Sequence, residues 1–154
     1  MSNILPLPSM KRILAIDYGN KRTGIAVTDP SQIIASGLTT VRTHDLFTFL
    51  TEYLAKEQVE SIVVGEPKNL DNTPTHGTLP ALEFIKRLKV KFPDMPIYRV
   101  DERFTSKMAF QAMIDGGLKK KDRQNKGTVD MVSAAIILQS FMEMKKSGNL
   151  PNQV

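Results

Sequence analysis

The chain has 154 residues, of which 41% are hydrophobic, and a formal net charge of +5. This length fits one domain with a proper core, and the basic balance (pI about 9.5) favours a polyanionic partner such as nucleic acid. The absence of cysteine excludes disulfides, thiol catalysis and cysteine-based zinc sites, and the distant His44 and His76 argue against a histidine metal site or a Ser-His triad.

We expect a single domain with loose ends. The predicted division is a flexible lead-in over residues 1–10, the domain over 11–146 and a flexible tail over 147–154. The lead-in carries two prolines and no periodicity. No apolar stretch is long enough to span a bilayer and the N-terminus lacks a signal-peptide pattern, so no membrane association is expected.

Three strands are predicted at the start of the domain, over residues 12–17, 23–28 and 33–41. The first is an unbroken apolar run that ends in Asp17, which is typical of a strand buried on both faces. Gly19 and Gly24 bracket a polar, basic turn, so the first two strands should form a β-hairpin. The third segment is rich in β-branched residues and short of charges.

Helices and strands alternate after the third strand. Apolar residues at helical spacing predict a helix that begins after Asp45, its expected N-cap. The remaining predicted elements are a strand over 61–65, a helix over 79–92, a strand over 97–100, a helix from 105 or 106 to 114, and a final helix from 127 or 128 to about 146. A long polar loop over 66–77 and a basic loop over 119–126 lie between them.

This order predicts an α/β fold with a mixed five-stranded sheet. Three antiparallel strands are followed by parallel crossovers, and helices cover both faces. It is the order of the ribonuclease H-like architecture, in which the first strand is central and the last lies close by. Fold alone does not supply function, so the chemistry must come from the side chains.

Four carboxylates fall where this topology brings chain segments together: Asp17, Asp101, Glu102 and Asp130. Asp17 ends the first strand, Asp101 and Glu102 end the last, and Asp130 is expected in the first turn of the final helix, facing the sheet. Gathered carboxylates raise one another's pKa values, and a divalent cation resolves their repulsion. Oxygen ligands without Cys or His indicate Mg²⁺ or Mn²⁺, and two such ions about 4 Å apart promote displacement at phosphorus.

Each acid also has a simpler explanation. Asp17 could cap a tight turn through Gly19, and Asp130 could be an ordinary acid at a helix N-terminus. Asp101 could form a surface pair with Arg103. Each explanation taken alone weighs about as much as the catalytic one, but all of them together on converging elements weigh much less.

Basic residues lie close in sequence to each of these acids. The candidate substrate-binding residues are Lys21, Arg22, Arg103, Lys120, Lys121, Arg123 and Lys126. From charge alone, the basic loop is best interpreted as a solvated surface. Its position just before Asp130 makes it a candidate phosphate clamp.

Four blocks of the sequence resemble those of the YqgF/RuvX family: residues 17–24, 63–67, 101–106 and 126–130. The match spans residue 11 to about 144. The resemblance implies a bacterial cytoplasmic protein with a ribonuclease H-like fold, which is either a nuclease for pre-16S ribosomal RNA or a Holliday junction resolvase. It carries over Asp17, the Asp101-Glu102 pair and Asp130 as catalytic acids. We expect Asp17, Glu102 and Asp130 to be the metal ligands, with Asp101 as the alternative to Glu102.

The chain departs from the family pattern at two places. Glu66 replaces a usually apolar residue before Pro67 and adds a carboxylate at the end of the fourth strand. The following loop, residues 68–77, does not keep the family's Asp-Gly-Thr run. These departures bear on loop contacts to substrate and leave the core acids in place.

The leading hypothesis is a metal-dependent endonuclease for structured nucleic acid, acting in 5′-end processing of pre-16S ribosomal RNA. The alternatives are a Holliday junction resolvase acting on branched DNA and a non-catalytic nucleic-acid-binding factor. Phosphotransferases of the actin and sugar-kinase type share the fold, but they need a second lobe for which this chain has no room. No dimer seam is evident, so we expect a monomer or weak homodimer, which suits RNA processing better than paired cuts in a junction.

Overall fold

Five strands and three α-helices make up the described part of the chain, residues 10–66, 76–101 and 125–154 of this computed structural model. The strands are β1 (Arg12–Asp17), β2 (Arg22–Thr28), β3 (Ala35–Arg42), β4 (Val59–Glu66) and β5 (Ile97–Asp101). The helices are α1 (Leu46–Lys56), α2 (Thr78–Lys91) and α5 (Lys126–Lys146). The helix expected over residues 105–114 lies outside the described residues.

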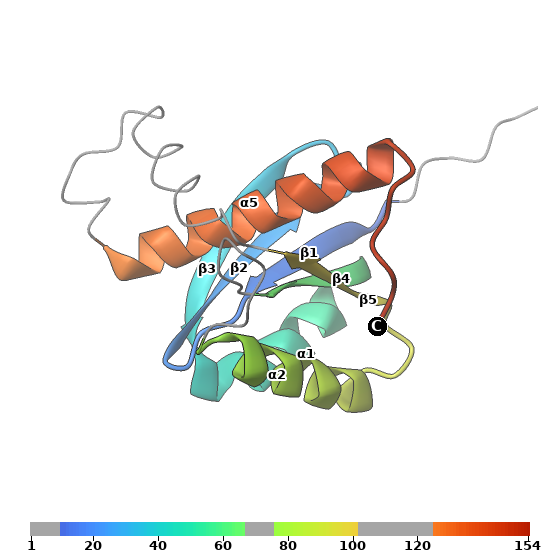
Figure 1. Ribbon diagram of the computed structural model, residues 1–154. Helices are drawn as coiled ribbons and strands as arrows, with labels where there is room; N and C mark the ends of the chain where they lie inside the picture. The colour runs from blue at the N-terminus through green and yellow to red at the C-terminus, as the bar shows by residue number, and fades with distance from the viewer. Residues whose placement is uncertain (1–9, 67–75, 102–124) are drawn as a thin grey trace, which may run out of the picture.

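All five strands form one sheet in the order β3-β2-β1-β4-β5 (Figure 1). β2 pairs antiparallel with β1 and β3, whereas β4 pairs parallel with β1 and β5. The predicted mixed sheet is therefore confirmed, with β1 in its centre. β5 is an edge strand separated from β1 by β4. Because β1, β4 and β5 run in the same direction, their carboxyl ends lie along one edge of the sheet.

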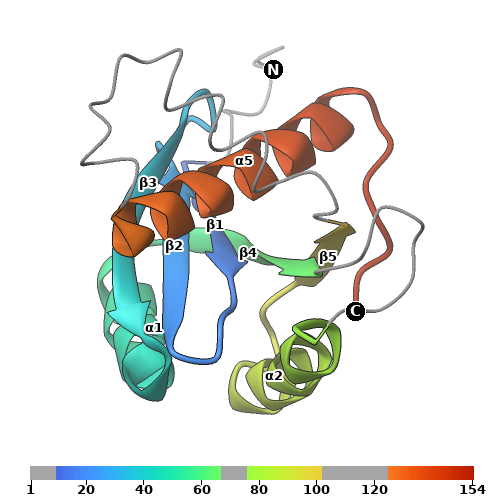
Figure 2. The same cartoon turned by 60° about the vertical axis from the view of Figure 1, so that its left-hand side comes forward.

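Helices cover both faces of the sheet, as predicted. The long helix α5 crosses one face, and α1 and α2 pack on the other (Figure 2). Successive residues of β1 alternate between the two layers: Ile13 and Ala15 pack against α5, while Leu14 and Ile16 pack against α1 and α2. All four are fully buried. This explains why the strand is apolar without interruption, since each large side chain buried this way contributes about 1.5–3 kcal/mol.

The third strand begins two residues later than predicted. One carboxylate oxygen of Asp29, Oδ1, accepts hydrogen bonds from the backbone N–H groups of Ile33 and Ile34, both at 2.7 Å. These bonds hold the two isoleucines in a turn, where their side chains are exposed. The β-branched segment does form a strand, but the hydrogen bonds to the Asp29 side chain delay its start to Ala35.

The helix ends differ from prediction in two details. Asp45 precedes α1 but makes no side-chain capping bond, because a 3-10 turn over Thr43–Asp45 leads into the helix. α5 begins at Lys126, where Asn125 caps it by accepting a hydrogen bond from the N–H of Thr128. Asp130 is thus the fifth residue of α5 and not in its first turn, which removes the explanation of Asp130 as an ordinary N-terminal acid.

The end of the chain lies along the edge strand. The backbone N–H of Val154 donates to the carbonyl of Ile97 at 2.8 Å, and Gln153 forms a β-bridge with Tyr98. The sequence predicts a flexible tail over 147–154, whereas its last two residues pair with β5. An edge strand carries unpaired backbone groups, and the tail satisfies part of them.

Candidate active site

Two of the predicted acids, Asp17 and Asp130, meet at Gly24. Asp17 is the register partner of Gly24 in the β1-β2 ladder. A Cβ atom at Gly24 would overlap the main-chain oxygen and carbon of Asp130, so α5 crosses β2 in direct backbone contact. Only glycine permits this approach. One residue of β2 therefore touches the segments that carry both carboxylates.

The alternation of β1 places Asp17 on the same face as Ile13 and Ala15, which is the face covered by α5. Directly opposed residues of an antiparallel pair have Cβ positions about 4.5–5.5 Å apart. Because Gly24 lies opposite Asp17 and against the backbone of Asp130, both acids belong to one small region at the carboxyl edge of the sheet. The predicted convergence of these two residues is present.

Arg22 compensates the charge of Asp130. Its Nε lies 3.0 Å from Oδ2 of Asp130, whose side chain is 22% exposed. Burial raises the pKa of Asp130 above its ordinary value, and this effect outweighs the opposing influence of Arg22 and Lys126. The carboxylate therefore sits where a negative charge is costly and where positive charge is favourable.

Arg42 is a basic residue of this site that sequence reasoning missed. It is the register partner of Arg22 in the β2-β3 ladder, so the two arginines lie directly opposite each other. Like charges in such a pair repel, and an anion between them relieves the repulsion. The hairpin register is the signal that identifies Arg42, and the register follows only from the folded sheet.

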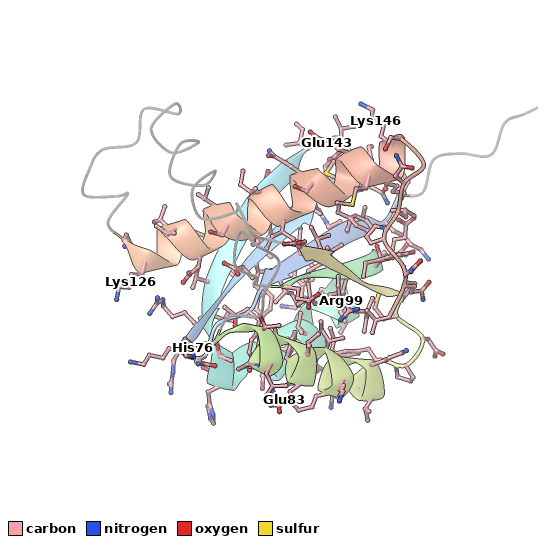
Figure 3. The ribbon with its side chains drawn as sticks, viewed as in Figure 1. His76, Glu83, Arg99, Lys126, Glu143 and Lys146 are labelled. Atoms are coloured by element: carbon pink, nitrogen blue, oxygen red, sulfur yellow. The ribbon has the colours of Figure 1, made fainter. Side chains whose placement is uncertain are left out.

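Two further predicted substrate-binding residues, Lys21 and Lys126, lie around the same edge. Lys126 opens α5 four residues before Asp130, at the end of the helix opposite to Glu143 and Lys146 (Figure 3). Lys21 is exposed in the turn between β1 and β2, and its carbonyl accepts the N–H of Thr43 at 3.0 Å. Of the four predicted substrate-binding lysines, the two that the structure describes thus lie at the edge that carries the two acids.

Asp101 lies on the other face of the sheet. It is exposed and in register with Glu66, and it shares the face of Ile97, which packs toward α1 and α2. The carboxylate of Glu66 lies 3.8 Å from the guanidinium of Arg99, and its side chain is only 14% exposed. The structure therefore separates Asp101 and Glu66 from the pair formed by Asp17 and Asp130.

Five predicted site residues lie outside the described residues: Glu102, Arg103, Lys120, Lys121 and Arg123. Among residues 10–66, 76–101 and 125–154, no group of three His, Asp or Glu side chains could hold a metal ion. The described part supplies two of the three expected ligands, and the third, Glu102, lies just beyond it.

The residues present fit a hard divalent cation. Asp17 and Asp130 offer only oxygen, which is the donor that Mg²⁺ and Mn²⁺ prefer. Burial makes the negative charge of Asp130 costly, and Arg22 is the cation that lies against it in this structure. Mg²⁺ sites commonly use few carboxylates, with water and substrate phosphate completing the shell.

Sequence comparisons identify close relatives. A family model described as RuvX, Holliday junction resolvase, matches residues 11–144. A protein of Phocaeicola vulgatus is 60% identical over 137 residues, which cover 89% of this chain and 99% of the relative. A protein of Christiangramia forsetii is 59% identical over 133 residues, with 86% and 98% covered. Both carry the provisional name pre-16S rRNA nuclease.

Solved structures share the fold at low sequence identity. RuvC of Thermus thermophilus, in complex with a Holliday junction, superposes with a TM-score of 0.61 at 18% identity, covering 94% of this chain and 99% of that one. The yeast mitochondrial Holliday junction resolvase Ydc2 gives 0.55 at 14% identity, with 92% and 81% covered. These likenesses confirm the predicted ribonuclease H-like fold.

Within the described residues, no helix has the length and apolar character needed to cross a membrane.

Proposed function

The chain belongs to the RuvX family, and from this premise we propose that it is a divalent-metal-dependent endonuclease that processes the 5′ end of pre-16S ribosomal RNA in the cytoplasm. The observation that carries the proposal is the meeting of Asp17 and Asp130 at Gly24, on the face covered by α5. The names of the relatives support a nuclease and point to ribosomal RNA as the substrate.

We assign Glu102 as the third ligand. Asp101 shares the face of Ile97, away from α5. Of the Asp101-Glu102 pair that the family resemblance carries over, Glu102 is therefore the member that we assign to the metal. Asp17, Glu102 and Asp130 would then hold Mg²⁺ or Mn²⁺, and Asp101 would act outside the metal shell.

The basic residues hold the substrate phosphates in this scheme. When bound, the metal lowers the pKa of water and stabilises the leaving oxygen of the phosphodiester. Arg22 and Arg42 oppose each other beside Asp130 and bind the phosphate that lies between them. Lys21 and Lys126 extend the contacts along the backbone, and Arg103, Lys120, Lys121 and Arg123 continue them.

The test is cleavage of two substrates by purified protein with Mn²⁺. A 5′-labelled pre-16S fragment should be cut at the mature end, while a four-way DNA junction should remain intact. Asp17→Asn and Glu102→Gln should lose cleavage, and Asp101→Asn should retain it. A preference for the junction would favour a resolvase, and sedimentation should then show a dimer. Binding of the RNA without cleavage of either substrate would indicate a non-catalytic factor.

A further inference from the structure

A second surface with nucleic-acid-binding chemistry lies on the sheet face opposite to α5. A groove of about 660 Å³ runs between α1 and α2. Phe47 of α1 lines one side, and Lys86, Arg87, Val90 and Lys91 of α2 line the other. Figure 2 shows both helices on the face of the sheet opposite to α5. None of these residues takes part in the site built around Asp17 and Asp130.

The composition of the groove is unusual for a solvated helix surface. Within the described part of the chain, its lining holds three cations and no carboxylate. Cations near a helix C-terminus are favoured by the helix dipole, which accounts for Lys91. The dipole does not account for Val90, which is 82% exposed between these cations. The half-buried ring of Phe47 packs on its inner side against Phe84, at 5.5 Å between ring centres, and its outer part lines the groove. Apolar and aromatic surface with a basic rim fits unpaired nucleotides, whose bases stack while their phosphates pair with cations.

The groove is connected to the proposed active site through Tyr18. Tyr18 directly follows Asp17, and its hydroxyl lies 3.4 Å from a terminal nitrogen of Arg87. The guanidinium carbon of Arg87 lies 5.7 Å from the centre of the Phe47 ring. The Tyr18 ring is stacked on Phe84 at 4.6 Å, which anchors it in the core between the sheet and helices α1 and α2. An RNA chain that leaves the site at Asp17 would therefore cross the edge of the sheet and meet Arg87 first.

We propose that the groove between α1 and α2 binds a single-stranded RNA segment that leads away from the scissile phosphate. Arg87, which lies over the Phe47 ring, provides a flat guanidinium surface on which a base stacks, and Lys86 and Lys91 bind the backbone. This inference rests on the proposed function, because that function supplies the scissile phosphate. It adds a requirement for unpaired nucleotides beside the cleavage site, since a duplex keeps its base faces covered.

The test compares two double variants with equal loss of charge. Lys86→Ala with Lys91→Ala removes the two groove lysines, while Lys56→Ala with Lys89→Ala removes two exposed lysines outside the groove. Binding is measured in EDTA, over a series of salt concentrations, to pre-16S RNA fragments with and without a single-stranded flank. The groove variant should bind the flanked RNA about tenfold more weakly and lose about 0.7 in salt slope for each phosphate contact. Phe47→Leu, which keeps an apolar side chain, should also weaken binding by about tenfold.

The inference is overturned if the two double variants lose the same affinity for the flanked RNA. It is also overturned if the groove variant loses the same affinity for RNA with and without the single-stranded flank. Retention of full affinity by the groove variant would overturn it as well. Failure of the proposed function would look different. The wild-type protein would bind flanked RNA more tightly than the groove variant does, but it would cleave no RNA. The melting temperature of each variant verifies that the fold is kept.

Discussion

Nε of Arg22 lies 3.0 Å from Oδ2 of Asp130, joining β2 to α5 across 108 positions of the sequence. The pair is partly exposed, so its direct contribution to stability is at most about 1 kcal/mol. Its importance lies in the charge balance of the site. Arg22 holds the carboxylate that we assign to metal binding, and it stands in register with a second arginine, Arg42.

The first prediction concerns metal binding by Asp17 and Asp130. Mn²⁺ at about one hundred times its Kd should stabilise the protein by about 2.7 kcal/mol, which raises the Tm by roughly 5–10 °C for a domain of this size. Asp17→Asn or Asp130→Asn should abolish the shift in a thermal melt. Asp94→Asn, which changes an exposed acid outside the site, should retain it. A shift that survives both site substitutions would exclude these residues as ligands.

The second prediction concerns the pH dependence of stability. Burial raises the pKa of folded Asp130 above 3.8, so the folded state binds its proton more tightly than the unfolded state. The stability contributed by Asp130 is therefore present below pH 3.8 and is lost as the pH rises through the raised pKa. The free energy of unfolding of Asp130→Asn, relative to wild type, should increase over this range.

Urea unfolding in EDTA at several pH values measures this difference. Arg22 opposes the rise in the pKa of Asp130. The Arg22→Gln variant, which keeps Asp130, should therefore lose more free energy of unfolding than wild type does over the same pH range. A relative stability of Asp130→Asn that falls with increasing pH would contradict the burial argument.

The third prediction concerns the contact at Gly24. Gly24→Ala places a methyl group against the main chain of Asp130, so α5 must move away from β2. We expect a loss of about 1–3 kcal/mol in urea unfolding, together with a loss of cleavage well below the Tm. Gly37→Ala is the matched control, because its new methyl group would lie 3.1 Å from Cβ of Met131 on the same helix. Equal effects of the two substitutions would mean that the position of Asp130 is not critical.

The fourth prediction separates substrate binding from chemistry. Arg42→Gln should weaken RNA binding for every sequence and lower the salt slope by about 0.7–0.9, the value for one phosphate contact. Its cleavage rate at saturating substrate should change little. Asp130→Asn should do the reverse, with binding kept and turnover lost. Lys146→Gln, at the far end of α5, is the control for charge alone (Figure 3). A loss of affinity in Lys146→Gln equal to that of Arg42→Gln would remove Arg42 from the site.

Local patterns in the sequence were sufficient to predict the main helices and strands and to predict that Asp17 and Asp130 lie close together. The bounds predicted for β1, residues 12–17, are those observed, because a strand buried on both faces must be apolar throughout and ends where polar residues begin. The spacing of apolar residues also predicted that Asp130 faces the sheet. The strand order followed from three meandering strands and the right-handed crossovers after them, so the meeting of Asp17 and Asp130 could be anticipated.

Only the tertiary structure decided how the basic residues meet the acids. The β2-β3 ladder shifts register between Ile25 and Ala26, and without that shift Arg22 would oppose Val41 in place of Arg42. The pairing of Arg22 with Asp130 likewise depends on α5 touching β2 at Gly24. Apolar periodicity is a property of neighbouring residues and can be seen in the sequence. Register, by contrast, is set by the packing of segments far apart in the chain, which no local pattern contains.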